Sequence, residues 1–379
     1  MATIDCESRA ALRELIELLR DLDERWLGPD WLMNGPGDVA EGARNLMHLL
    51  QGGLHSYFED DPDHPVFRRI VSPERKFTGD NADAIYFDAP VRPDRVYRIR
   101  GNLCGAVYFS LTVEEGARDG GLSVATDAVL NDDGMDVGAD GSFEVVAGGP
   151  ARPRNWLALA PAATRITTRH YFEEERCAAA DPTRVIPFEI GVIDPQAPPA
   201  APADASVAAG IRRVATFIRT RTFDMGKPGD RVQPAFVSVV PNEFPPPVKP
   251  LDFGAAAADA AYSMAPYVIG PDQALVFTGR WPRCRFANVS LWNRHMMTFD
   301  YANRRVSLNR RQTQLEKDGT FRMVLAHRDP GVPNWLDTEG RLFGLVFWRY
   351  MLPDGPIEAP RATVVPFAEV ARAGSSAGV

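Results

Sequence analysis

A chain of 379 residues and 41.7 kDa is too long for one ordinary hydrophobic core, so we expect two or more domains. A hydrophobic content of 45% with 24% charged residues is typical of a folded protein, and a net charge of −8 argues against nucleic acid as a partner. There is neither a secretory signal pattern nor the run of about 18 apolar residues that a membrane helix needs, so we expect a cytoplasmic protein without a membrane partner.

The first 70 residues have the apolar spacing of helices. Apolar residues recur every three or four positions over residues 8–26 and again over 38–57, and Gly28-Pro29 separates the two segments. We therefore expect a helical cap over residues 1–70.

The cysteines give no sign of a metal or redox centre. Cys6, Cys104, Cys177 and Cys284 are far apart and none forms a CxxC pair. We expect reduced thiols, no bound metal and no organic cofactor.

Residues 71–177 change to short segments rich in β-branched and aromatic residues, separated by Gly, Pro, Asn and Asp. Many short strands at this spacing indicate a sandwich or barrel. The segments that we expect to be strands are 84–87, 96–100, 106–113, 122–126, 143–147 and 165–171.

Residues 178–265 read as a linker with helices. Residues 196–202 are rich in proline, a helix is expected from about Asp204 to Thr222 with Asp204 as its N-cap, and a short helix over 253–264. A second β region should then occupy residues 266–370, followed by a disordered tail at 371–379.

Landmarks of the first β region return in the same order in the second. Each region contains an Asp-Gly turn, an Asn-Trp-Leu segment and a late arginine beside aromatic residues. The landmarks are Asp140-Gly141, Asn155-Trp156-Leu157 and Arg169 in the first region, and Asp318-Gly319, Asn334-Trp335-Leu336 and Arg349 in the second. We infer a duplicated domain, and we expect Trp156 to superpose on Trp335 and Arg169 on Arg349.

The second region resembles the bacterial family catalogued as domain of unknown function 1214. The resemblance lies in the ordered segments between Phe286 and Pro356: 289–293, 306–309, 318–319, 333–337 and 347–350. It implies an antiparallel β-sandwich or jelly-roll-like domain, and some relatives with such a domain have been linked to polysaccharide breakdown. The fold class that we expect is mainly β with α additions: two duplicated sandwiches, an N-terminal helical cap and a helical linker.

Polar residues of the second copy are the candidate site. His295 and His327 with Asp329 or Asp337 could form a metal site or an acid–base pair, because histidine is easily poised for proton transfer near neutral pH. Arg294 and Arg349 suit an anionic substrate group, and Trp292 precedes Arg294 in the family-like segment. We predict that His295, His327 and Asp337 are catalytic and that Arg294, Arg349 and Trp292 bind substrate.

Other motifs have structural explanations. Asn334 can turn the backbone and Trp335 can anchor a loop in the core, so we favour a scaffold role for both. The acidic loop 131–140 could hold calcium, but it lacks the terminal glutamate of an EF-hand, and we favour a solvated hairpin.

Two functional classes stay open. The first is an enzyme that needs no cofactor and acts on a carbohydrate or another small anionic or polar metabolite. The second is a non-catalytic ligand-binding protein or interaction platform. A small-molecule ligand is expected in both, and a homo-oligomer is compatible with both.

Overall fold

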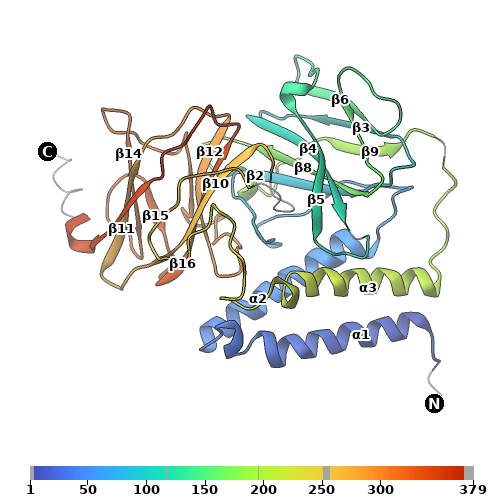
Figure 1. The fold of residues 1–379 in the computed structure, drawn as a ribbon, viewed down its shortest axis with the longest axis horizontal. Coiled ribbons are helices and arrows are strands. Elements are labelled where there is room, and N and C mark those ends of the chain that lie inside the picture. The colour runs from blue at the N-terminus through green and yellow to red at the C-terminus, as the bar shows by residue number, and fades with distance from the viewer. Residues whose placement is uncertain (1–3, 117, 195, 251–256, 371–379) are drawn as a thin grey trace.

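The protein consists of two β-sandwiches that stand side by side, with three helices along one side of them (Figure 1). The structure is a computed structural model that describes residues 4–116, 118–194, 196–250 and 257–370. The predicted fold class is confirmed: the sheets are open and occur as duplicated pairs. None of the helices in these residue ranges is both long enough and apolar enough to cross a membrane. The predicted tail at 371–379 lies outside the described residues.

The first sandwich pairs a sheet of order β1-β2-β8-β4-β5 with a sheet of order β7-β6-β3-β9. Its apolar core lies between the sheets and includes Ile99, Phe109, Leu111 and Val145. The strands are β1 (Arg68–Arg69), β2 (Ala84–Pro90), β3 (Tyr97–Asn102), β4 (Tyr108–Gly116), β5 (Ser123–Asn131), β6 (Ser142–Ala147), β7 (Trp156–Leu157), β8 (Ala163–Tyr171) and β9 (Phe188–Val192).

The second sandwich has the same strand order, with β10-β16-β12-β13 facing β15-β14-β11-β17. From β2 onward, each strand of the first copy has its counterpart eight strands later, down to the parallel pairs β6–β7 and β14–β15. The strands are β10 (Ala260–Val268), β11 (Gln273–Gly279), β12 (Phe286–Trp292), β13 (Ser307–Asn309), β14 (Phe321–Ala326), β15 (Trp335–Asp337), β16 (Phe343–Met351) and β17 (Arg361–Pro366).

The Asn-Trp landmark has the same local structure in both copies. Asn155 and Asn334 have positive φ values of 49° and 56°, and each carboxamide bonds two neighbouring backbone segments. The indole of Trp156 donates to a backbone carbonyl at 3.0 Å and that of Trp335 at 3.1 Å, but both rings are only partly buried. The asparagine is thus a backbone brace, and the tryptophan covers the sheet edge instead of filling the core.

The helical cap combines α1 (Glu7–Asp21), α2 (Pro36–Gly53) and α3 (Asp204–Thr220), so a helix of the linker joins the N-terminal helices. Leu18, Trp26, Leu49 and Phe217 belong to their shared apolar cluster. The short turns of the chain are η1 (Leu22–Trp26), η2 (Pro29–Trp31), η3 (Leu54–Phe58), η4 (Asp132–Gly134), η5 (Ala178–Ala180) and η6 (Phe223–Met225).

Asp204 does not cap its own helix as predicted, because α3 begins at Asp204 and Ala203 holds the N-cap position. Its carboxylate instead accepts from the backbone amides of Glu7 at 2.8 Å and Ser8 at 3.1 Å, the first residues of α1. The hydrogen bonds from Ser8 and Glu7 lower the pKa of Asp204 to about 2. The side chain therefore joins the starts of two helices.

The copy boundaries differ from the expected ones at three strands. β1 lies within the expected cap over residues 1–70 but pairs with β2 of the first sandwich. β9 pairs with β3, so the first copy continues beyond residue 177 into the expected linker. β10 occupies residues 260–264 of the expected helix over residues 253–264, whose first residues lie outside the described part. The alanine-rich sequence favours a helix, but β10 is buried beside β16, and tertiary packing overrides that preference.

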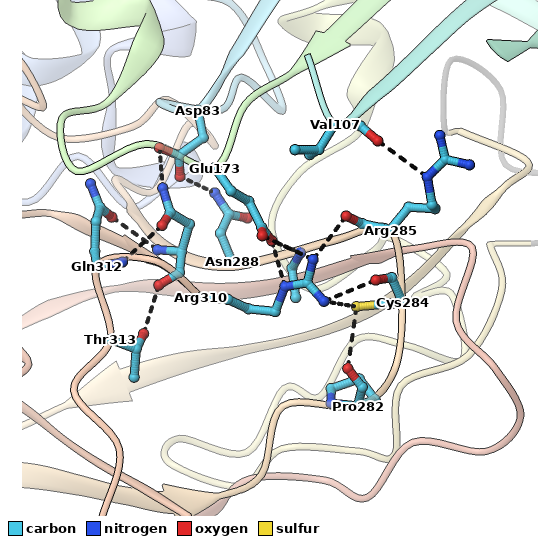
Figure 2. A network of polar contacts seen from close by, with 12 residues as sticks. Asp83, Val107, Glu173, Pro282, Cys284, Arg285, Asn288, Arg310, Gln312 and Thr313 are labelled. Carbon is cyan, nitrogen blue, oxygen red and sulfur yellow. Dashed lines mark hydrogen bonds and ion pairs between the residues drawn. The ribbon is translucent and has the colours of Figure 1, made fainter. Parts of the chain in front are cut away.

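A buried polar network joins the two copies (Figure 2). Asp83 of the first copy accepts from the side-chain amides of Asn288 at 2.8 Å and Asn309 at 3.0 Å. Arg310 and Glu173 form an ion pair across the same boundary at 2.6 Å. Burial raises the pKa of Asp83 to about 6, so its amide partners offset only part of the cost of burying the carboxylate.

Candidate functional site

A cavity of about 560 Å³ lies where the two copies and the helical cap meet. Strands β2, β4 and β8 of the first copy and β10, β12 and β16 of the second supply its walls. Residues of α2, η3 and α3 close one side, and residues 231–234, where Val232 is 97% exposed, lie at the surface. Its size and its mainly apolar lining with a few polar groups are those of a small-molecule site.

Arg349 of β16 is the buried charge of this cavity. Its side chain is only 5% exposed, and its guanidinium lies 5.0 Å from the ring centre of Phe347 and 5.5 Å from that of Tyr262. It donates to the Tyr86 hydroxyl at 3.3 Å and to the Gly79 carbonyl at 3.2 Å. Its Nε is buried without an acceptor, and no carboxylate in the described residues lies within 4.0 Å of it.

Tyrosine hydroxyls surround this guanidinium. The hydroxyl oxygens of Tyr86 and Tyr171 lie 3.3 Å apart. Burial is the main cause that raises the pKa of Tyr86 well above its usual value, and burial also raises that of Tyr262. The Tyr86 phenol is therefore neutral at physiological pH and can donate a hydrogen bond to an anion beside Arg349.

The first copy contributes the equivalent arginine to the same cavity. Tyr86 lies opposite Arg169 in the β2–β8 pairing, as Tyr262 lies opposite Arg349 in the β10–β16 pairing. Arg169 donates to Thr112 at 2.6 Å, and its guanidinium lies 3.8 Å from the Glu114 carboxylate. One arginine of the duplicated pair thus has an acidic neighbour.

The register of the sheets explains why Arg349 has no such acidic neighbour. Ser110 on β4 pairs with Arg169, and Asn288 on β12 pairs with Arg349, so Glu114 and Trp292 occupy equivalent positions. Trp292 stacks on Phe347 at 4.2 Å and donates its indole N–H to the Asp80 carbonyl at 3.0 Å. An indole replaces the carboxylate, so Arg349 has aromatic neighbours and no carboxylate of the described residues within 4.0 Å.

Two of the six predicted site residues, Arg349 and Trp292, line this cavity. Arg294 instead fixes the helical cap: it pairs with Asp38 at 2.7 Å and donates to the Leu32 carbonyl at 2.6 Å. The structure does not bring the expected cluster together around one cavity.

His295 packs beneath the cap, with its ring centre 5.2 Å from that of Trp26. Burial, followed by the charges of Arg294 and Arg231, lowers its pKa to about 3. The imidazole is thus neutral at physiological pH, and its Nε2 is buried without a partner. In this position it stabilises packing between the second copy and the cap.

His327 and Asp337 lie on the other sheet of the second copy and do not line the cavity. His327 contacts the Thr338 hydroxyl at 2.6 Å and the Gly270 carbonyl at 3.2 Å. Asp337 pairs with Arg304 at 2.8 Å. These contacts brace loops at the sheet ends, so neither side chain faces the other residues of the predicted group.

The acidic loop contacts the second copy. Asp132 and Asp133 both pair with Arg285, the latter at 2.6 Å. Within the described residues, no three His, Cys, Asp or Glu side chains form a group that could hold a metal ion.

Sequence reasoning missed Tyr86, Glu114, Arg165 and Arg221, which also line the cavity. A signal was available in β8, where Arg165, Thr167 and Arg169 share one face of the strand. Polar residues at period two in a central strand indicate a hydrated face or a cavity.

Comparison with known proteins gives the fold but no activity. Residues 271–354 match the family described as protein of unknown function (DUF1214). A crystal structure of an uncharacterised protein from Burkholderia cenocepacia is similar with a TM-score of 0.81 and 26% identity, over 95% of this chain and 97% of that one. A Vibrio parahaemolyticus protein gives a TM-score of 0.49 and 12% identity over 85% and 99% of the two chains. The sequence matches no curated protein.

Proposed function

We propose that the protein binds a small organic anion in the central cavity, with the acidic group on Arg349 and the apolar part against the aromatic wall. The observation that supports this most directly is the buried Arg349 guanidinium, whose Nε has no acceptor and which no carboxylate of the described residues approaches within 4.0 Å. Burying an N–H donor of a charged group without an acceptor is costly, and a ligand carboxylate would supply the missing acceptor. The fork of the guanidinium suits a planar carboxylate, and the Tyr86 hydroxyl could add a third donor.

A thermal-shift and calorimetric screen tests the proposal with hexanoate and benzoate as probes and their uncharged amides as controls. We expect the carboxylates to raise the melting temperature and the amides to have little effect. Arg349→Gln should weaken carboxylate binding by about tenfold or more, since a charged hydrogen-bonding partner is lost. Arg305→Gln, at an exposed arginine of the same copy, is the matched control. Equal binding of amides and acids, or parent-like binding by Arg349→Gln, would refute it.

A second candidate is an enzyme that acts on the bound anion. Its specific support is Glu114, which lines the cavity and has a buried Oε2 without a hydrogen-bonding partner in the described residues. A carboxylate with a free oxygen beside a bound substrate can take up a proton. Proton NMR in deuterated water would detect exchange or turnover of the bound acid, and Glu114→Gln should abolish it while retaining binding.

A further inference from the structure

We infer that the ligand of the central cavity carries two acidic groups, one at each end of an apolar body, and that Arg221 binds the second. This inference rests on the proposed function, because Arg349 is taken to bind the first. It assigns the ligand to the α,ω-dicarboxylates.

The charged residues that line the cavity do not balance. Five are arginines and three are acids. The arginines are Arg165, Arg169, Arg221, Arg231 and Arg349, and the acids are Asp80, Asp88 and Glu114. An excess of positive charge in the cavity favours an anionic ligand, and the arginines without an acidic partner show where its acidic groups would bind.

Two of these arginines already have acidic partners. Arg165 bonds Asp88 at 2.6 Å and also Asp60, which lies outside the cavity lining, at 2.6 Å. Arg169 lies 3.8 Å from Glu114. The other three arginines have no carboxylate of the described residues within 4.0 Å.

Arg221 follows α3 and lies against the aromatic wall of the cavity. Its guanidinium is 3.8 Å from the ring centre of Phe217 and 5.4 Å from that of Phe77. One terminal nitrogen donates to the Phe217 carbonyl at 3.2 Å and the Gly120 carbonyl at 3.3 Å. Its Nε, like that of Arg349, is buried without an acceptor. The neutral carbonyls orient the side chain without neutralising it.

Of the three arginines without an acidic partner, Arg231 donates its Nε to the Gly226 carbonyl at 3.0 Å. Arg221 and Arg349, whose Nε has no acceptor, lie toward opposite ends of β8. Arg349 shares Tyr86 with the end that carries Arg169. Arg221 is connected to the other end of β8 by two aromatic rings. It stacks on Phe217, whose ring centre lies 4.9 Å from that of Tyr57. The Tyr57 ring centre in turn lies 4.3 Å from the Arg165 guanidinium. Four residues of strand separate Arg165 from Arg169, which is roughly 13 Å.

Apolar side chains occupy the wall between these ends. Val71, Phe236 and Met264 are buried there, and Ile70 and Phe77 pack against the same cluster. A monocarboxylate would leave one guanidinium unpaired, whereas a dicarboxylate with a hydrocarbon or aromatic middle would pair both and cover the apolar wall.

Calorimetric titration with paired probes tests the inference. The probes are the α,ω-dicarboxylates from succinate to sebacate, each beside the monocarboxylate of equal chain length. We expect one member of the dicarboxylate series to bind about tenfold or more tightly than its monocarboxylate. Arg221→Gln should remove that advantage and leave monocarboxylate affinity unchanged. Arg219→Gln, at an exposed arginine in the last turn of α3, should behave as the parent.

The outcomes separate this inference from the proposed function. If monocarboxylates bind through Arg349 but no dicarboxylate binds more tightly, the inference of a second acidic group is refuted, while the proposed anion site at Arg349 is supported. If neither series binds, or Arg349→Gln binds both like the parent, the proposed function fails first. Arg221→Lys keeps the positive charge but loses the forked N–H donors of the guanidinium. Circular dichroism confirms that each variant is folded. A parent-like dicarboxylate advantage in a folded Arg221→Gln protein overturns the role of Arg221.

Discussion

At the scale of single residues, the fold resists the protonation of His295: burial lowers the pKa of this imidazole from 6.5 to about 3. The unfolded chain takes up a proton below pH 6.5 and the folded chain does not. Stability is therefore complete above pH 6.5 and falls as the pH decreases toward 3.

We expect His295→Leu to remove this part of the acid sensitivity. The unfolding free energy of the variant minus that of the parent should rise by up to about 2 kcal/mol as the pH falls from 7 to 5. Urea denaturation at each pH measures this difference. His64→Leu is the contrasting control, because the hydrogen bond to Asp61 raises the pKa of His64. If His295→Leu differs from the parent by the same unfolding free energy at pH 7 and at pH 5, burial of His295 does not cause the acid sensitivity.

Asn334 predicts a second effect at this scale. Its carboxamide accepts from the Gln314 amide at 2.8 Å and donates to the Arg322 carbonyl at 3.0 Å, and its φ is 56°. Asn334→Ala loses these bonds and strains the backbone, so we expect a loss on the order of 3 kcal/mol in a denaturation experiment. Asn334→Gly accepts the positive φ and should lose less. A glycine variant as unstable as the alanine variant would exclude the backbone contribution.

The sequence predicts some site residues better than others for a physical reason. Arg349 and Trp292 stand in a recognisable segment, and both line the cavity. Tyr86, Glu114 and Arg221 come from segments distant in the chain, and only the sheet register and the packing of α3 bring them together. His295 looked reactive because histidine titrates near neutral pH, but its burial beneath the cap is a tertiary property.

At the scale of elements, periodic patterns identified the helices of the cap and most strands of the first copy. They failed where neighbours decide the conformation, as in β10, whose alanines favour a helix. They also could not show which helix Asp204 caps, because a capping pattern is local and this contact joins distant segments.

Asp204→Ala should loosen the start of α1 without unfolding the sandwiches. Hydrogen–deuterium exchange should rise in residues 7–12 of the variant and remain unchanged in β14. Since the pKa of Asp204 is lowered to about 2, its stabilisation is present above about pH 4 and is lost as the pH falls through 2. Asp230→Ala, at an exposed aspartate beyond α3, is the control, and an unchanged exchange rate in α1 would contradict the capping role.

At the scale of the whole molecule, the copies are held together by a buried polar network beside a shared apolar cluster. Asp83→Ala would leave the amides of Asn288 and Asn309 without their acceptor, so we expect a loss on the order of 3 kcal/mol. Because burial raises the pKa of Asp83 to about 6, its stabilisation declines as the pH rises from 4 to 6.

The loss on Asp83→Ala should accordingly be larger at pH 5 than at pH 7 when both proteins are unfolded with urea. Asp354→Ala removes an exposed carboxylate that pairs with Arg283 at 3.5 Å and should change little at either pH. A loss that grows with pH would show that the Asp83 carboxylate is favoured, not penalised, by its surroundings.

The exchange of Glu114 for Trp292 at equivalent positions bears on the orientation of whatever occupies the cavity. Two identical sandwiches around a shared space would offer an acidic group two equal arginines, and the ligand could bind in either of two directions. Because a carboxylate lies beside Arg169 and an indole lies near Arg349, we expect the acidic group of a ligand at Arg349 and not at Arg169. The exchange makes the two halves of a duplicated cavity chemically different, so the surroundings of Arg169 and of Arg349 offer different groups to a ligand.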